Sequence, residues 1–315
     1  MTETAAILEK LLPILLLMLT GFVFRQTGFV TQQVMEGMKK LAVNVTLPVI
    51  IFLSLLESEL HAAYLPLALS VFLVSCVLLV AGQLLIRRLG WPNKYAGLLF
   101  TGYENGMLGY GVFAAVFGQE LIYPIVILDL GQTLFFAMIF TTYMRSLNHE
   151  LNEITLKSVG KACLTNPYLL VSAAAILTNV TGLSESIQEQ SLGQGILETL
   201  QILGGLTTPL MCLAIGYGIR LRKQYLSKAL IVIALRLFLL GGIAVLFNCF
   251  IIKELLGPDS LFTPAVYTMF MLPPFFVGAL LIRPDETESR EFAFSVISLH
   301  TITFMVLFCL IAPIL

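Results

Sequence analysis

The chain has 315 residues, of which 58% are hydrophobic and 12% are charged, and its formal net charge is −1. Soluble domains contain roughly 25% charged residues, so this composition, with a mean hydropathy of +0.93, excludes a soluble protein and indicates an all-α integral membrane protein. The net charge gives no indication of a nucleic-acid partner. The five cysteines lie in apolar segments without C-x-x-C spacing, so we expect no disulfides, no metal site and no cofactor.

Ten apolar windows can be counted along the chain, and the connections between them are too short to hold a soluble domain. A transmembrane helix needs about 20 apolar residues, and each window is close to that length. The first window lacks a basic segment ahead of it, so it does not resemble a cleaved signal peptide. The windows lie at residues 5–24, 38–56, 62–86, 95–117, 121–144, 162–181, 196–219, 227–251, 261–282 and 290–314.

Lysine and arginine gather in the connections that follow the odd-numbered windows. Fifteen of the 18 basic residues lie there, two lie on the opposite side, and Arg236 lies within the eighth window. Basic residues favour the cytoplasmic side of a membrane, so we expect both termini outside. The fifteen are Arg25, Lys39, Lys40, Arg87, Arg88, Lys94, Arg145, Lys157, Lys161, Arg220, Arg222, Lys223, Lys228, Arg283 and Arg290.

The fourth window contains a stretch that does not suit a plain membrane helix. Residues 101–111 place Glu104 and Asn105 among several glycines. Glycine weakens a helix, and a carboxylate that faces lipid is costly, so we expect a helix break covered by protein or a water-filled cavity. Close packing of a neighbouring helix against the glycines is the alternative. The glycines expected at the break are Gly106, Gly109 and Gly111.

The ninth window is expected to break for a different reason. Pro273 and Pro274 lack amide hydrogens, and a proline inside a helix costs roughly 3 kcal/mol. An ordinary kink is the alternative. Broken helices in corresponding positions of two halves indicate a transport site, because half-helix amides can hold an anion and free carbonyls a cation.

Prolines recur in the same order in both halves of the chain, which indicates an internal repeat. The pairs are Pro13 with Pro167, Pro48 with Pro209, and the Glu104 stretch with Pro273. Five spans in each half would invert the second copy relative to the first. The sequence therefore predicts a 5+5 inverted repeat, with residues 1–150 as the first copy and 151–315 as the second, unless the prolines align by chance.

On these motifs the chain resembles the auxin efflux carrier family and, more distantly, the bile acid/sodium symporters. The long cytoplasmic loop of plant auxin exporters is missing, so the chain looks more like a bacterial carrier, a multi-pass protein of the inner membrane. Six motifs follow the family's order over essentially the whole chain. They are Leu11-Leu-Pro13 through Thr20-Gly-Phe22, Leu47-Pro48, Glu104-Asn-Gly-Met-Leu-Gly109, Asp129-Leu-Gly131, Leu164-Thr-Asn-Pro167 and Pro273.

The resemblance implies ten transmembrane helices in which helices four and nine are broken and cross near the bilayer midplane. Spans one, two, six and seven would form a scaffold, with a homodimer through spans two and seven. Spans three to five and eight to ten would form a mobile transport unit. Similar proteins move organic anions, namely auxin in plants and carboxylates such as malate or malonate in bacteria.

Ionisable residues inside the apolar windows are the candidates for ion coupling, because such groups are costly in a membrane. Glu104 could bind a proton or sodium, or it could be a protonated hydrogen-bond donor that only pins the crossing. Asp129 could be a second relay site or form a salt bridge with Arg236. His300 could relay protons, although a lone histidine is more often a buried structural group.

Substrate contacts are expected near the breaks and near the scaffold prolines. Arg236 could pair with a substrate carboxylate or with one of the buried acids. Thr207 and Thr208 are further candidates, unless such hydroxyls bond to their own helix. The expected substrate-binding residues are Asn44, Thr46, Asn105, Gly106, Arg236, Pro273 and Pro274.

These observations predict a secondary carrier that exports an organic anion by elevator-type alternating access, with proton coupling at Glu104. A sodium/proton exchanger of the same architecture, which would use Glu104 and Asp129, is the alternative. The chain has no H-E-x-x-H, G-x-S-x-G or G-x-x-x-x-G-K-[ST] motif, so neither an intramembrane enzyme nor a nucleotide-driven pump is expected. The pair of broken helices also disfavours a channel.

Overall fold

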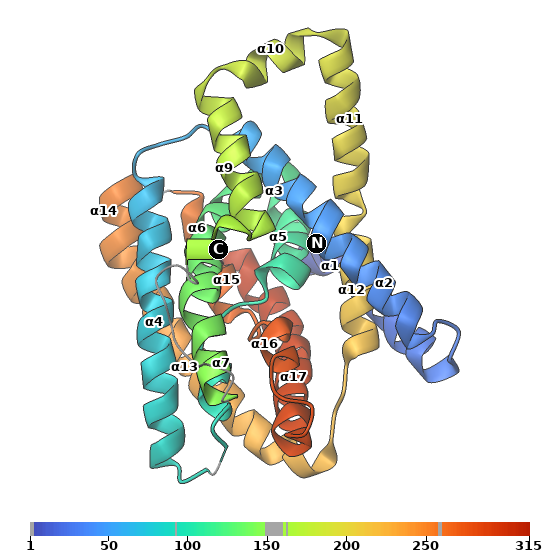
Figure 1. Ribbon diagram of the computed structural model, residues 1–315, viewed down its shortest axis with the longest axis vertical. Coiled ribbons are helices and arrows are strands. Elements are labelled where there is room, and N and C mark those ends of the chain that lie inside the picture. The colour runs from blue at the N-terminus through green and yellow to red at the C-terminus, as the bar shows by residue number, and fades with distance from the viewer. Residues whose placement is uncertain (1–2, 92, 149–159, 162, 258–259) are drawn as a thin grey trace.

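The computed structural model describes residues 3–91, 93–148, 160–161, 163–257 and 260–315, and every regular element in these residues is a helix. Most helices run along the long axis of the molecule, and α10 crosses one end (Figure 1). The first half contains α1 (Glu3–Thr27), α2 (Gln32–Leu41), η1 (Ala42–Thr46), α3 (Leu47–Leu56), α4 (Tyr64–Arg88), η2 (Ala96–Phe100), η3 (Asn105–Gly109), α5 (Tyr110–Phe117), η4 (Gln119–Leu121), α6 (Tyr123–Phe135), η5 (Phe136–Phe140) and α7 (Thr141–Leu147). The second half contains α9 (Pro167–Val180), α10 (Leu183–Glu189), α11 (Ser191–Gly205), α12 (Thr207–Gly218), η6 (Lys223–Tyr225), α13 (Leu226–Phe247), η7 (Asn248–Ile252), α14 (Lys253–Leu256), α15 (Phe262–Met271), α16 (Phe276–Leu280), α17 (Thr287–Ile311) and η8 (Ala312–Ile314).

Eight helical stretches in the described residues are long and apolar enough to cross a membrane. A ninth is added if α9 and α10, which are bent by 79° at their junction, form one broken span. The molecule is therefore an all-helical, multi-pass membrane protein. The eight stretches are Ala5–Thr27, Gln32–Leu56, Tyr64–Arg88, Tyr123–Leu147, Ser191–Gly218, Lys223–Leu256, Phe262–Leu280 and Thr287–Ile314.

Eight of the ten predicted windows contain helical stretches that are long and apolar enough to cross a membrane, and the fourth and sixth windows do not form such a stretch as one continuous helix. The fourth window, residues 95–117, is divided into the short elements η2, η3 and α5, because its backbone is extended at Thr101. The sixth window yields α9, which has 14 residues. At a rise of 1.5 Å per residue α9 is roughly 21 Å long, shorter than a hydrocarbon core of about 30 Å.

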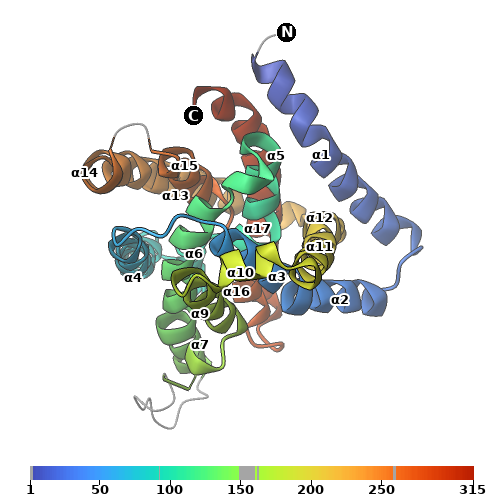
Figure 2. The same ribbon diagram turned by 90° about the horizontal axis from the view of Figure 1, so that it is seen from above.

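The helices pack most closely within two sets. In the first set α1 lies on α12, and α3 lies on α9 and α11. In the second set α4 lies on α6 and η2, and α13 lies on α15 and α17. Seen from above, α1, α2 and α12 lie on one side of the molecule and α4, α13 and α15 on the other (Figure 2). The sets meet where α12 contacts η3 and α1 contacts α5.

Two glycines allow α1 and α12 to approach closely. A Cβ atom at Gly216 would collide with the backbone carbonyl of Met18, and one at Gly21 would collide with the carbonyl of Leu213. Small residues at such positions let helix backbones touch, which is a main source of helix association in membranes. The close contact between α1 and α12 therefore requires residues without a Cβ atom at Gly21 and Gly216.

Replacing Gly216 by alanine is expected to lower stability, because the new methyl group must push α1 away from α12. Overpacking of this kind costs about 1–3 kcal/mol. Gly205→Ala is the matched control, since a Cβ atom there meets no atom within 4 Å. Thermal unfolding of the purified protein in detergent measures the effect, and equal melting temperatures for the two variants would contradict this packing.

Candidate functional site

The interruptions in residues 95–117 and 261–282 lie against each other. The first runs from Thr101, which is extended, to Glu104, and it contains Gly102 at φ +74°. The second runs from Leu272 to Phe275, both in extended conformation, through the two prolines. The backbone N–H of Glu104 donates to the carbonyl of Pro273 at 3.0 Å. Two segments that lie far apart in the sequence are thus joined through their irregular backbones, which we call the crossing.

Glu104 makes a second link across the crossing. Its Oε2 accepts a hydrogen bond from the backbone N–H of Phe276, the first residue of α16. The residue is 8% exposed, and no ion pair to it occurs in the part of the chain that the structure describes. Its carboxylate also borders a small cavity of about 20 Å³ that Ser298 and Thr301 line. The buried carboxyl group is therefore held by an amide and not by a buried cation.

The three predicted break glycines lie just after the extended residues. Gly106 and Gly109 belong to the π-helical turn η3, and Gly111 belongs to α5. A Cβ atom at Gly109 would press on the Leu272 side chain, and one at Gly111 on Thr208. Close packing, the alternative weighed for these glycines, is thus present alongside the interruption.

Gly102 is the glycine that sequence reasoning missed. Its positive φ favours glycine, and a Cβ atom would overlap the ring of Phe275 from the other interruption. The sequence offers one signal for this position, because Gly102 lies only two residues before Glu104, where a helix break was expected. The need for a positive φ becomes visible only in the folded chain.

Asp129 on α6 ties the crossing to the neighbouring helix. Its Oδ1 accepts from Asn105 Nδ2 at 2.7 Å and from Gln132 Nε2 at 2.9 Å, and its Oδ2 accepts from the Tyr110 hydroxyl at 2.6 Å. Gln132 also bonds both the N–H and the carbonyl of Tyr103, at 2.5 and 2.8 Å. Gln132 and Tyr110 were not predicted, although Gln132 follows Asp129 by three residues and so shares its helix face.

Arg236 is fully buried on α13 and donates to three backbone carbonyls. The acceptors are Leu99 at 2.9 Å, Gly102 at 2.5 Å and Leu272 at 3.2 Å. These carbonyls end η2 and α15 or lie between η2 and η3, where helical hydrogen bonding stops. The possible salt bridge to Asp129 does not form, because that carboxylate is engaged by Asn105, Tyr110 and Gln132. A substrate-binding role for Arg236 stays a prediction.

The remaining predicted residues are placed less centrally. His300 on α17 is fully buried, and neither of its ring nitrogens has a hydrogen-bond partner among the described residues. The hydroxyl of Thr207 donates to that of Thr46 at 2.8 Å, joining the second and seventh predicted spans. Asn44 is exposed on η1. The structure thus brings together Glu104, Asn105, Asp129, Arg236 and the two prolines, and their roles stay predictions.

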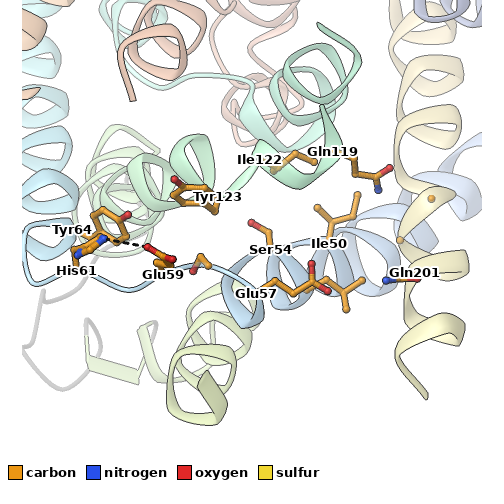
Figure 3. A pocket seen from close by; sticks show the side chains of 14 residues that line it. Ile50, Ser54, Glu57, Glu59, His61, Tyr64, Gln119, Ile122, Tyr123 and Gln201 are labelled. Carbon is orange, nitrogen blue, oxygen red and sulfur yellow. Dashed lines mark ion pairs between the residues drawn. The ribbon is translucent and has the colours of Figure 1, made fainter. Parts of the chain in front are cut away.

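An acidic cavity of about 590 Å³ opens where α3 ends and α4 begins (Figure 3). Glu57 and Glu59 line it, and Glu59 lies 4.0 Å from His61. Tyr64 and Tyr123 close one side, as the close-up shows. The cavity therefore offers two exposed carboxylates at one end of the helix bundle.

Comparison with known proteins gives two matches. The family described as "Membrane transport protein" matches residues 6–257. A protein of Methanothermobacter thermautotrophicus described as an uncharacterized transporter is 25% identical over 243 residues, which cover 73% of this chain and 74% of that protein. The family match includes the first interruption, Asp129 and Arg236.

Proposed function

Because the chain belongs to the membrane transport protein family, that of the auxin efflux carriers, we propose that it is a secondary active transporter that exports an organic anion with proton coupling. Family membership makes it a membrane transporter and not an enzyme. The proposed substrate is a small carboxylate, and the proposed coupling ion is a proton carried by Glu104.

One observation carries the proposal: Glu104 is a buried carboxyl group at the crossing, and it forms no ion pair within the described residues. An uncompensated charge is very costly in such a place. A proton can neutralise this group, and its loss changes the charge at the point where the two interruptions meet. The charge state of Glu104 would then favour different arrangements of the crossing.

We propose that the transport cycle is an elevator movement of one helix set against the other. The set of α1, α2, α3, α9, α11 and α12 would be the scaffold, and the set around α4 to α7 and α13 to α17 the moving unit. Support comes from the packing, which is closest within each set. The crossing belongs to the second set and meets the scaffold at α12, so a sliding movement would carry it along the scaffold.

The ten-span inverted repeat is part of this proposal. Irregularities recur in corresponding places, since η1 precedes Pro48 in the second span, and a turn at Leu206 precedes Pro209 in the seventh. The two interruptions at the crossing form the third such pair. The boundary between residues 150 and 151 lies outside the described residues.

We further propose the bacterial inner membrane as the location, with both termini outside and the basic connections in the cytoplasm. Among the basic residues that support this orientation, Lys157 lies outside the described residues. A homodimer through the second and seventh spans completes the proposal. Val45, Ile202 and Leu206 are exposed on these spans and would be available to a second copy.

A sodium/proton exchanger is the second candidate, and the geometry at Asn105 favours keeping it. Asn105 follows Glu104 directly in the sequence, and its Nδ2 donates to the carboxylate of Asp129. Its own Oδ1 is buried without a partner in the described part of the chain. Two carboxylates and an amide oxygen are suitable ligands for a hard cation.

Charge movement in proteoliposomes separates the two candidates. Malate, malonate and indole acetate are added across a pH series, with sodium present or replaced by choline. We expect currents that require an organic anion, change with pH and are indifferent to sodium. Currents driven by sodium in the absence of any organic anion would instead identify the exchanger.

A further inference from the structure

A basic cavity of about 570 Å³ lies at the end of the bundle where α2 begins, α12 ends and α17 begins. It has an apolar floor that includes Met35, Phe276 and Leu280. The charged residues around it are Lys39, Lys40, Arg220, Arg290, Glu36 and Glu291.

Three of the four cations rest on aromatic rings. Lys39 Nζ lies 4.5 Å from the centroid of Phe276, and the guanidinium carbons of Arg220 and Arg290 lie 5.6 and 5.8 Å from that of Phe294. The two rings pack together at 5.1 Å. Within the described residues no carboxylate forms an ion pair with any of the three cations. Cation–π contacts hold these groups in place without neutralising them.

The two carboxylates do not cancel this positive charge. Glu291 is paired with Arg222 at 2.8 Å, and Arg222 lies outside the cavity lining. Glu36 is exposed and accepts a hydrogen bond from Gln32 at 2.9 Å. Clefts lined by one sign of charge raise the local concentration of the opposite ion. The cavity is therefore suited to an anion.

Phe276 separates the basic cavity from Glu104. Together with Gly218, it lines both the basic cavity and the small cavity that Glu104 borders. The backbone N–H of Phe276 donates to Glu104, and the ring of the same residue makes the cation–π contact with Lys39. The N–H of Arg220 donates to Ser298, which also lines the small cavity, at 2.9 Å. One side-chain layer thus lies between the cations and the crossing.

The charge of the basic cavity contrasts with that of the acidic cavity. The two cavities lie toward opposite ends of the span Gln32–Leu56. Lys39 lies in the first third of Gln32–Leu56, and Glu57 directly follows that span. On Ser191–Gly218 the basic cavity reaches the last residue, Gly218, whereas the acidic cavity reaches Gln201 near the middle. An anion is attracted at one end of the molecule and repelled at the other.

We propose that the basic cavity is a binding site for a small organic carboxylate, from which the anion passes Phe276 to reach the crossing. This inference rests on the proposed transport of an organic anion and adds the residues that capture it. Lys39, Arg220 and Arg290 bind the carboxylate, and the apolar floor favours an organic body over an inorganic ion.

The test replaces Lys39, Arg220 and Arg290 by glutamine, singly and together, and measures malonate transport. We expect KM to rise about two- to fivefold for each cation removed, the range for ion pairs open to solvent, with little change in kcat. Lys223→Gln is the matched control, because Lys223 is exposed in the neighbouring connection and does not line the cavity. Its KM should equal that of the unchanged protein.

Titration calorimetry with malonate and with chloride gives a readout that does not require transport. We expect malonate binding that the triple variant loses, and weaker binding of chloride. If transport occurs but the triple variant keeps its KM, this inference is overturned while the proposed function stands. If the unchanged protein transports no anion, the proposed function fails. Malonate binding measured by calorimetry, and its loss in the triple variant, would still test whether the basic cavity binds a carboxylate.

A phosphate headgroup could use the same cations, so the assays are repeated in vesicles of zwitterionic lipid alone. We expect the same KM differences there. If they appear only when anionic lipid is present, the cations bind headgroups and the inference is wrong.

Discussion

Replacing Glu104 by glutamine is expected to abolish accumulation driven by a pH gradient while leaving anion exchange between the two sides intact. Glutamine has nearly the same shape, and its carbonyl oxygen can still accept from the N–H of Phe276. The crossing should therefore form. Glutamine cannot gain or lose a proton, so the variant behaves as a permanently neutral Glu104 and its transport should no longer depend on pH.

Two assays in proteoliposomes measure this difference. In counterflow, labelled malonate exchanges with internal malonate at equal pH, and the rate should stay near that of the unchanged protein. Under a pH gradient, accumulation should fall to the level of protein-free vesicles. Glu198→Gln is the control, because Glu198 is exposed on α11, a helix that does not contribute to the crossing. A Glu104→Gln protein that keeps its pH dependence would rule out Glu104 as the proton carrier.

Replacing Arg236 by methionine is expected to destabilise the fold more than it alters substrate affinity. The change leaves the carbonyls of Leu99, Gly102 and Leu272 without their buried donor. Each unsatisfied buried group costs about 1–3 kcal/mol, and removal of the buried charge offsets part of this loss. We expect a net destabilisation of roughly 2–4 kcal/mol, with a low yield of monodisperse protein.

Thermal unfolding in detergent checks this expectation. Lys228→Met is the matched control, because Lys228 is an exposed cation on the same helix, α13. Arg236→Lys keeps the charge but replaces the guanidinium fork, whose two terminal nitrogens serve separate carbonyls, by a single nitrogen, so its stability should be intermediate. An Arg236→Met protein with an unchanged melting temperature and a raised KM would instead identify Arg236 as a substrate ligand.

Which segments form helices, and where helices are interrupted, could largely be predicted from the sequence. Long apolar windows favour membrane helices, because a helix satisfies its own backbone in lipid, and eight of the ten windows form helices long and apolar enough to cross a membrane. Pro273 and Pro274 lack amide hydrogens, so an interruption follows from their covalent structure alone. The glycine-rich stretch around Glu104 likewise indicated irregular backbone, although the extended residues begin at Thr101, before Gly106, Gly109 and Gly111.

The sequence by itself thus determined that the protein is a helical membrane transporter of a recognisable family, with irregular backbone in two segments and an acid in one of them. Only the tertiary structure decided the partners: Glu104 with the amide of Phe276, 172 residues away, and Arg236 with carbonyls 36 to 137 residues away. Hydropathy and helix propensity act along neighbouring residues. Which donor meets which acceptor depends on how distant helices pack, and the chain order does not contain that geometry in any local pattern.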